Sequence, residues 1–367
     1  MSRRRPFRSR YASPASRTPR ASRTPRASRA SRAFRTFRTT ALVITAALPA
    51  TALAGCATPD TVAPPRAGLH PSKAAVPRTL FPTGPAASFT TATTLADGTR
   101  IRVTDLHGAK SGFTGKVWVW TPKQYSDPAY AKSGFPVLIS LPGSYGYPVN
   151  YWKSTHLGFE SNVARWSEQG KSVPFIVVMP VLNPNNKHYY DGSDIPGQPK
   201  MGTWLTEDVP DFVRANYRTF QSRDGWAFMG SSSGGFAALK SVLQKPDKFK
   251  AAIASGPDTV PDSPLWKGYE EEREANDPEE LATALARKPD TPANRVYLAF
   301  QIGTLETGIM ESLKDFIRTY TNKGPVKSHL QVIEGGAHNA RSYMKGMDEG
   351  TIAWISQYLQ GPIPASS

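Results

Sequence analysis

The sequence has little cysteine and lacks the short motifs of metal and cofactor enzymes. Cys56 is the single cysteine among 367 residues, so an internal disulfide and a zinc site built from several cysteines are excluded. No H-E-x-x-H motif, phosphate-binding P-loop or dinucleotide fingerprint occurs. We therefore expect neither a metal nor an organic cofactor.

Acidic residues are absent from residues 1–55, which contain 13 arginines and no lysine. The whole chain has 45 basic and 29 acidic residues and a net charge of +16; without this segment 32 basic residues face the same 29 acidic ones, a net charge of +3. A nucleic-acid-binding domain usually carries its positive charge on a folded face. The charge here belongs to the N-terminal segment, so we expect no nucleic-acid partner.

No apolar run reaches the roughly 20 residues of a membrane-spanning helix. Residues 1–40 are rich in Arg, Ser and Ala and repeat ASRTPR at 15–20 and 21–26, a composition that does not fold. An apolar stretch of about 15 residues follows, and this order is typical of a signal peptide. We assign residues 1–55 to a signal peptide with a long Arg-rich first part, and Arg4-Arg5 leaves the export route open.

The apolar stretch ends in Leu53-Ala54-Gly55-Cys56, which resembles the lipobox of bacterial lipoproteins. The resemblance implies cleavage before Cys56 and acylation of its thiol, hence an extracytoplasmic protein anchored to the membrane by lipid. The alternative is a buried apolar helix that contains a cysteine by chance. Residues 56–97 then form a tether rich in Pro, Ala and Thr.

Residues 98–362 alternate between strand and helix patterns, which predicts an α/β fold with a mostly parallel central sheet and helices on both faces. Residues 100–105 and 115–120 alternate apolar and polar positions, as a hairpin of half-buried strands does. Later apolar runs predict buried strands; they lie at 136–141, 174–179, 225–229, 251–254, 296–300 and 326–333. Helical patterns lie at 159–168, 203–217, 233–243, 310–321 and 342–359. The charged segment 261–291 is expected to be a cap or a surface excursion.

The motif G-x-S-x-G occurs at Gly230–Gly234, between a predicted strand and a predicted helix. A turn this tight brings its two glycines together and leaves the central serine exposed at the sheet edge. The helix N-terminus behind the serine favours negative charge. The spacing selects Ser232, rather than its neighbouring serines, as the nucleophile; the alternative is an ordinary turn with Ser233 as the helix N-cap.

A serine nucleophile needs a base, and the base needs an acid that orients it. In the hydrolases that carry this motif the acid and then the histidine follow the serine along the chain. His338 lies in a glycine-rich loop after the last predicted strand, whereas His329 lies within that strand. Glu306 follows the strand near 296–302 and is the preferred acid; Asp315 and Glu311 are weaker alternatives.

Two backbone N–H groups are expected to stabilise the oxyanion. One belongs to Ser233, directly after the nucleophile. The other belongs to the loop Leu141–Gly146, where Ser144 is the best candidate. Five aromatic residues near this edge could line an acyl pocket: Tyr145, Trp152, Tyr189, Tyr190 and Trp204.

Residues 98–360 resemble the putative-esterase family of α/β-hydrolases, which includes S-formylglutathione hydrolases, feruloyl esterases and mycolyltransferases. The resemblance rests on the elbow, on 203–216, on Lys245–Phe249 with Ala254–Gly256, and on the loop Gly335–Asn339. It departs from the family pattern at three positions. Pro142-Gly143 stands where many members have His-Gly or Asp-Gly, and Ser233 stands where methionine is common. Glu306 is the acid type of the mycolyltransferase branch, whereas esterases often have Asp.

The resemblance and the residues agree on a serine carboxylic-ester hydrolase that forms an acyl-enzyme through Ser232, Glu306 and His338. Its expected partners are a small-molecule or lipid ester and the membrane that holds the anchor. Two alternatives stay open: an acyltransferase of the mycolyltransferase type, and an inactive lipid-anchored binding protein. The substrate, the acyl length and the oligomeric state stay open too.

Overall fold

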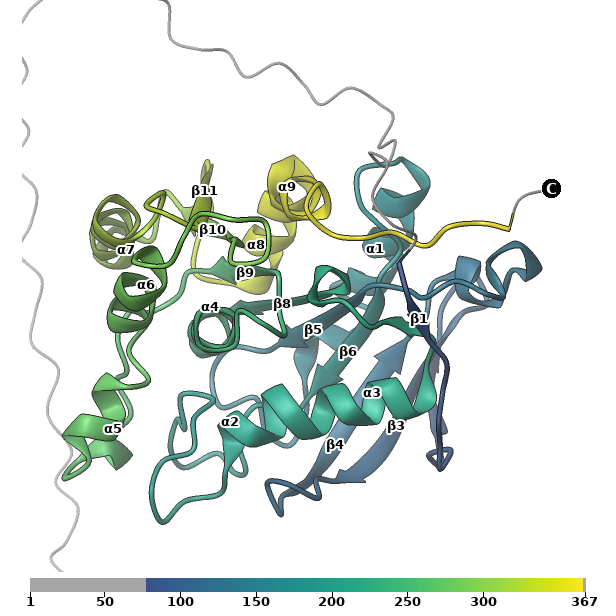
Figure 1. The fold of residues 1–367 in the computed structure, drawn as a ribbon, viewed down its shortest axis with the longest axis horizontal. Coiled ribbons are helices and arrows are strands. Elements are labelled where there is room, and N and C mark those ends of the chain that lie inside the picture. Colours follow the sequence, from purple (N-terminus) through teal and green to yellow (C-terminus); the bar gives the residue numbers. More distant parts are fainter. Residues whose placement is uncertain (1–76, 366–367) are drawn as a thin grey trace, which may run out of the picture. The chain divides into compact units, whose positions relative to one another are not determined.

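The structure is a computed structural model that describes residues 77–365; the predicted signal peptide and Cys56 lie outside them. The described chain forms a nine-stranded sheet with the order β11-β10-β9-β8-β5-β6-β4-β3-β2 (Figure 1). Its strands are β2 (Thr90–Thr94), β3 (Arg100–His107), β4 (Thr114–Trp120), β5 (Val137–Leu141), β6 (Ile176–Pro180), β8 (Trp226–Ser231), β9 (Ala251–Ser255), β10 (Val296–Gly303) and β11 (Val326–Ile333). The six strands from β11 to β6 are parallel, and β4, β3 and β2 continue the sheet as antiparallel strands.

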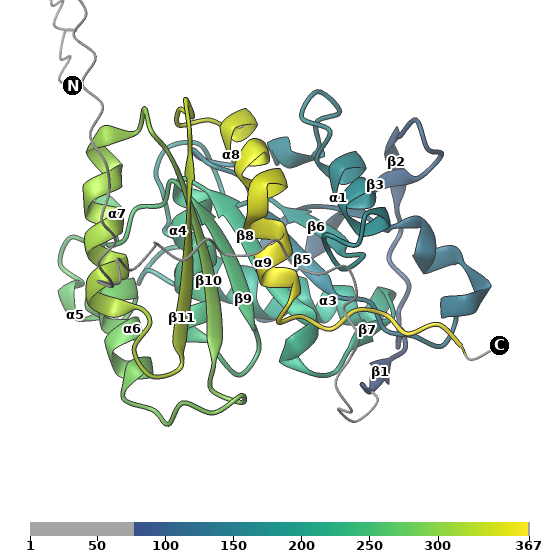
Figure 2. The ribbon, with the colours of Figure 1, turned by 90° about the horizontal axis from the view of Figure 1, so that it is seen from above.

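Helices cover both faces of this sheet, as predicted, with α3, α4 and α6 on one face and α1 and α9 on the other (Figures 1 and 2). The helices are α1 (Phe159–Glu168), α2 (Met201–Thr203), α3 (Val209–Asn216), α4 (Ser233–Gln244), α5 (Glu270–Glu274), α6 (Pro278–Ala286), α7 (Thr307–Tyr320), α8 (Ala340–Gly346) and α9 (Ile352–Ser356). π-Helical turns η4 (Trp204–Asp208) and η7 (Met347–Thr351) join α2 to α3 and α8 to α9. Short 3₁₀ turns are η1 (Lys123–Ser126), η2 (Pro128–Tyr130), η3 (Tyr151–Lys153), η5 (Arg223–Gly225) and η6 (Pro264–Trp266).

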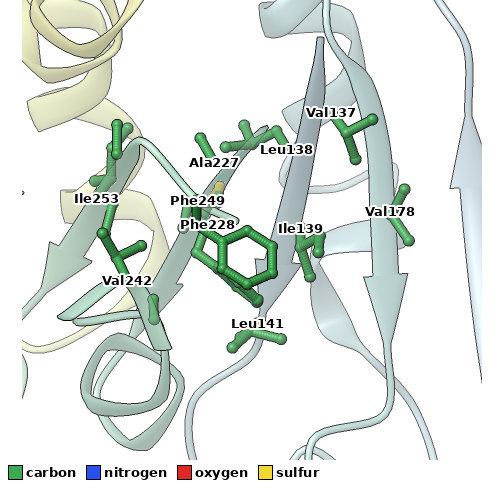
Figure 3. Close-up of a cluster of buried hydrophobic side chains, with 14 of the residues drawn as sticks. Val137, Leu138, Ile139, Leu141, Val178, Ala227, Phe228, Val242, Phe249 and Ile253 are labelled. Carbon is green, nitrogen blue, oxygen red and sulfur yellow. The ribbon is translucent and has the colours of Figure 1, made fainter. Parts of the chain in front are cut away.

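The central strands form the core because their side chains are apolar on both faces. Every residue of β5, β6, β8 and β9 is buried, which is why these strands read as continuous apolar runs. Figure 3 shows Phe228 of β8 within this cluster, and its ring centroid lies 4.7 Å from that of Phe249. A core packed from both sides gives a rigid support for the loops at the sheet edge.

The structure differs from the prediction at the start of the folded domain. The fold was expected to begin at residue 98, but β2 pairs with β3, and β1 (Thr79–Leu80) pairs with β7 (Thr219–Phe220). Ordered structure therefore includes part of the predicted tether. Residues 261–291 are a surface excursion that contains α5 and α6, and Ala282 and Leu285 of α6 are buried.

Both ends of the described chain lie beside residues 133–135, which precede β5. The Gly134 N–H donates to Thr79 Oγ1 over 2.8 Å, and the Ile363 N–H donates to Ser133 Oγ over 2.9 Å. Since strands β5 and β8 begin here, both ends lie at the amino edge of the parallel sheet. No helix within residues 77–365 is long and apolar enough to cross a membrane.

Candidate active site

Ser232 occupies a strained turn between β8 and α4. Its backbone dihedrals are φ 54° and ψ −128°, a region that side-chain-bearing residues rarely adopt. The turn is held on both sides, because the Ser232 N–H donates to the Ser255 carbonyl over 2.8 Å and the Ser232 carbonyl accepts from the Phe236 N–H over 2.9 Å. The serine therefore stands at the carboxyl edge of the sheet, at the start of α4.

The two glycines of the motif are required by close backbone approach. A Cβ atom at Gly230 would lie 2.2 Å from the Gly234 carbonyl oxygen. A Cβ atom at Gly234 would lie 2.3 Å from the Pro142 carbonyl oxygen, in the loop after β5. Real Cβ atoms do not approach backbone this closely. Both positions therefore require glycine, because the end of β8, the start of α4 and the loop after β5 pack directly against one another.

Glu306 and His338 lie together although 32 residues separate them in the sequence. Glu306 follows β10 and is 6% exposed, and His338 lies between β11 and α8. His338 Nδ1 lies 2.5 Å from Glu306 Oε2, and Glu306 Oε1 accepts the Gly303 N–H over 2.7 Å. The carboxylate is thus fixed on one side by backbone and faces the imidazole on the other.

Tyr343 of α8 completes this arrangement and was not found from the sequence. Its hydroxyl donates to Glu306 Oε2 over 2.7 Å and lies 2.9 Å from His338 Nδ1. Gly256 lies beneath the group, since a Cβ atom there would lie 2.1 Å from the Tyr343 hydroxyl and 3.0 Å from His338 Nδ1. A single tyrosine with no surrounding motif gives no sequence signal that could have identified it.

For each residue of this pair, hydrogen bonding and burial shift the pKa in opposite directions. Burial raises the pKa of Glu306, but hydrogen bonds from His338, Gly303 and Tyr343 together lower it by more, so the net pKa lies below the ordinary value of 4.5. The hydrogen bond with Glu306 raises the pKa of His338, burial lowers it, and the net pKa lies above 6.5. The geometry therefore favours an ionised carboxylate beside an imidazole that binds protons more readily than usual.

Ser232 and His338 line one cavity of about 400 Å³ at the carboxyl edge of the sheet. Its other lining residues are Gly143, Ser144, Tyr151, Leu157, Tyr189, Ser231, Asn339, Ala340 and Tyr343. Within residues 77–365 the Ser232 hydroxyl forms no hydrogen bond to His338, a bond that is often long in enzymes without substrate. The cavity nevertheless gives both side chains access to one bound molecule.

The two residues predicted to stabilise an oxyanion contact each other beside this cavity. The Ser233 hydroxyl donates to the Ser144 carbonyl over 2.6 Å, and Ser144 has a positive φ of 57°. Ser233 is the first residue of α4, so its N–H has no partner within the helix. Among the described residues, no hydrogen-bond acceptor pairs with the Ser144 N–H.

The aromatic residues predicted to line a pocket fall into two groups. Tyr189 lines the cavity, and Tyr145 stacks on it with ring centroids 4.8 Å apart. The remaining three are buried in the core: Trp152, Tyr190 and Trp204. The indole N–H of Trp152 donates to the Leu141 carbonyl, and that of Trp204 donates to the Val181 carbonyl. These rings therefore hold the backbone at the ends of β5 and β6 and do not line the cavity.

The segment 189–192, whose Tyr189 lines the cavity, is held by hydrogen bonds to the excursion 261–291 and to α4. The buried carboxylate of Asp191 accepts the Trp266 indole N–H over 2.7 Å and the Ser263 N–H over 3.1 Å. Lys240 of α4 donates to the Gly192 carbonyl over 2.6 Å. The excursion therefore helps to shape the cavity, although it contributes no lining residue.

The other acids and the other histidine considered from the sequence lie elsewhere. Asp315 and Glu311 are on the exposed face of α7, with side chains 59% and 77% exposed, and they pair with Arg318 and Lys314. His329 stacks on Trp354 with centroids 5.5 Å apart, as expected for a structural residue. Among residues 77–365, no group of three or more His, Cys, Asp or Glu side chains is arranged to hold a metal ion.

This architecture, a mostly parallel sheet with a serine elbow after β8, defines an α/β-hydrolase fold. The chain belongs to the family described as putative esterase, whose pattern matches residues 116–360. The folded domain is thus that of an esterase, and the match includes the segments that carry Ser232, Glu306 and His338.

Solved structures share this fold at low sequence identity. A ferulic acid esterase aligns with a TM-score of 0.57 and 17% identity over 71% of this chain and 98% of its own. An S-formylglutathione hydrolase from Agrobacterium tumefaciens gives 0.53 and 19% identity over 74% and 99%. A fluorophosphonate-binding serine hydrolase from Staphylococcus aureus gives 0.53 and 15% identity over 70% and 98%. These similarities support the fold assignment.

We predict that Gly230→Ala disrupts the elbow, because the new methyl group would lie 2.2 Å from a backbone oxygen that cannot move away freely. Overpacking of this kind costs about 1–3 kcal/mol or more, and thermal unfolding should show the loss. Gly308→Ala is the matched control, since a Cβ atom there meets nothing within 4 Å and alanine suits the helix. Equal stability of the two variants would contradict the proposed packing.

Proposed function

We propose that this protein is a serine carboxylic-ester hydrolase in which Ser232 is the nucleophile, His338 the general base and Glu306 the orienting acid. The observation that carries the proposal is the 2.5 Å contact between His338 Nδ1 and Glu306 Oε2, beside the cavity that both His338 and Ser232 line. An imidazole held through Nδ1 presents Nε2 to a serine proton.

The reaction begins when Ser232 Oγ attacks the ester carbonyl carbon and its proton passes to His338 Nε2. The carbonyl oxygen becomes an oxyanion, which the backbone N–H groups of Ser144 and Ser233 stabilise. The carbon–oxygen bond to the alcohol then breaks, and His338 returns the proton to the departing alcohol. An acyl group remains attached to Ser232.

Water is the second substrate that we propose. His338 accepts a proton from water as the water oxygen attacks the acyl carbon. The bond between that carbon and Ser232 Oγ then breaks, His338 returns the proton to Ser232 Oγ, and the carboxylic acid leaves. The His338 side chain is 41% exposed, so water can reach it once the alcohol has departed. The complete set of serine, imidazole and carboxylate argues against the inactive-binding-protein alternative.

We further propose that the enzyme acts outside the cytoplasm and is held at the membrane through lipid on Cys56. The support is in the sequence, where an apolar stretch ends in Leu-Ala-Gly-Cys. A tether of Pro, Ala and Thr follows, and it leads to the folded domain at β1.

Labelling with a fluorophosphonate probe tests the nucleophile. We expect the wild-type protein to be labelled and Ser232→Ala to be unlabelled, because the probe reacts with an activated serine. Ser231→Ala and Ser233→Ala are matched controls on either side of it, and both should retain labelling since neither removes the attacking oxygen or a backbone donor. Labelling of Ser232→Ala would refute the assignment.

The pH dependence of kcat/KM on a short p-nitrophenyl ester tests the base. The base must be neutral, and its pKa is raised, so activity should fall as the pH drops through an apparent pKa above 6.5. Glu306→Gln removes the main cause of that shift; the acid limb should move to lower pH and the rate should fall by about 10⁴-fold. Asp315→Asn, on the surface of α7, should change neither. An acid limb that Glu306→Gln leaves in place would contradict the pairing.

Cell fractionation tests the anchor. In a host that processes lipoproteins, the wild-type protein should be found with the membrane, and Cys56→Ala should lose this attachment because no thiol remains to be acylated. Mass spectrometry of the wild-type N-terminus should detect a lipid-modified Cys56. An unmodified N-terminus, or equal membrane attachment of both proteins, would exclude this anchor.

A further inference from the structure

Tyr151 joins the two sides of the candidate oxyanion site through its hydroxyl group. It begins η3 in the chain after β5, and its ring lines the same cavity as Ser232. The Gly143 N–H donates to the Tyr151 oxygen over 2.8 Å, and the Ser231 hydroxyl is its second partner. The phenol oxygen thus contacts the residue before Ser144 and the residue before Ser232.

The protons of this cluster can be assigned by counting donors and acceptors. The Gly143 N–H can only donate, so it occupies one acceptor position of the phenol oxygen. Ser231 is 2% exposed, and within residues 77–365 its hydroxyl has no hydrogen-bond partner besides Tyr151. If Tyr151 donated to Ser231, the serine proton would be buried without an acceptor, at a cost in free energy. The favoured arrangement has Ser231 donating to Tyr151.

In that arrangement the phenol oxygen accepts two hydrogen bonds and its own proton has no protein acceptor. The cavity lies on the open side of Tyr151, next to Ser144 and Ser232. We propose that the Tyr151 O–H donates to the carbonyl oxygen of the bound ester and to the oxyanion that forms from it. Tyr151 is then a third donor beside the N–H groups of Ser144 and Ser233. This inference rests on the proposed ester hydrolysis.

The phenol acts by sharing its proton, and no bond at Tyr151 breaks during the reaction. Burial raises the pKa of Tyr151 and hydrogen bonds from Ser231 and Gly143 lower it by less, so the net pKa lies above the ordinary value of 10.0. The side chain is therefore a neutral donor across the working range of an imidazole base. A preorganised donor of this kind stabilises charge that develops in the transition state.

Kinetics of Tyr151→Phe are the first test. Loss of an oxyanion donor lowers kcat by about 10²–10³-fold, and KM should change little because the bond strengthens in the transition state. Ser231→Ala is the matched control: it leaves the phenol proton in place, so kcat should fall less than about tenfold. Comparable losses in the two variants, or full activity of Tyr151→Phe, would overturn the proposal. Thermal unfolding checks that both variants fold.

Replacement of Tyr151 by the more acidic 3,5-difluorotyrosine is the second test, and it separates a donor from a structural acceptor. A phenolate still accepts from Gly143 and Ser231 but cannot donate, so kcat should fall at a lower alkaline pH than in the wild type. The other titratable residues lining the cavity are Tyr189, His338 and Tyr343. Difluorotyrosine at Tyr130 of η2, which does not line the cavity, is the control that should leave the limb unchanged. An alkaline limb unaffected at position 151 would overturn the proposal.

These outcomes are distinct from failure of the proposed function. If the wild-type protein hydrolyses no ester and its Ser232 takes no fluorophosphonate, ester hydrolysis itself is wrong. If the wild type is active and Tyr151→Phe is equally active, the hydrolase stands and the role of Tyr151 is refuted.

Discussion

The backbone of Ser232, held at φ 54° and ψ −128°, is the constraint on which the site depends. Strain of this kind persists only where the surroundings fix the chain on every side. Here Gly230 lies against Gly234, Gly234 lies against the loop after β5, and the Ser255 carbonyl accepts the Ser232 N–H. Together these contacts fix the exposure of the serine, the start of α4, and the distance from the loop that carries Ser144.

Glu306 and His338, the proposed acid and base, are brought together by a second close approach between loops. A Cβ atom at Gly303 would lie 2.2 Å from the Gly336 carbonyl oxygen, and that oxygen accepts the Leu305 N–H over 2.9 Å. Strands β10 and β11 are adjacent and parallel, and they pair in register from Val296 and Val326 to Gly303 and Ile333. The loops that follow the two strands therefore begin side by side at the carboxyl edge of the sheet. Glu306 and His338 lie in these two loops, so the pairing of the strands brings their side chains into contact.

The strand and helix pattern was predictable because each central strand is buried on both faces and helices such as α1, α3 and α7 bury one apolar side. The spacing of the elbow glycines selected Ser232, and the order of elements selected Glu306 and His338. Tyr151 and Tyr343 could not be selected, because the chain has 14 tyrosines and only the folded loops decide which hydroxyl faces the site. The early strands were missed because Thr79, Leu80 and β2 lie in a segment whose Pro, Ala and Thr composition is typical of a linker.

Both ends of the described chain contact residues 133–135, so they lie at the same end of the parallel sheet. Strands β5 and β8 run from that end to Leu141 and Ser231, so the whole length of the central strands separates both described chain ends from the cavity that Ser232 lines. A second domain joined directly to either end of the described residues would therefore begin at the end of the central strands opposite Ser232.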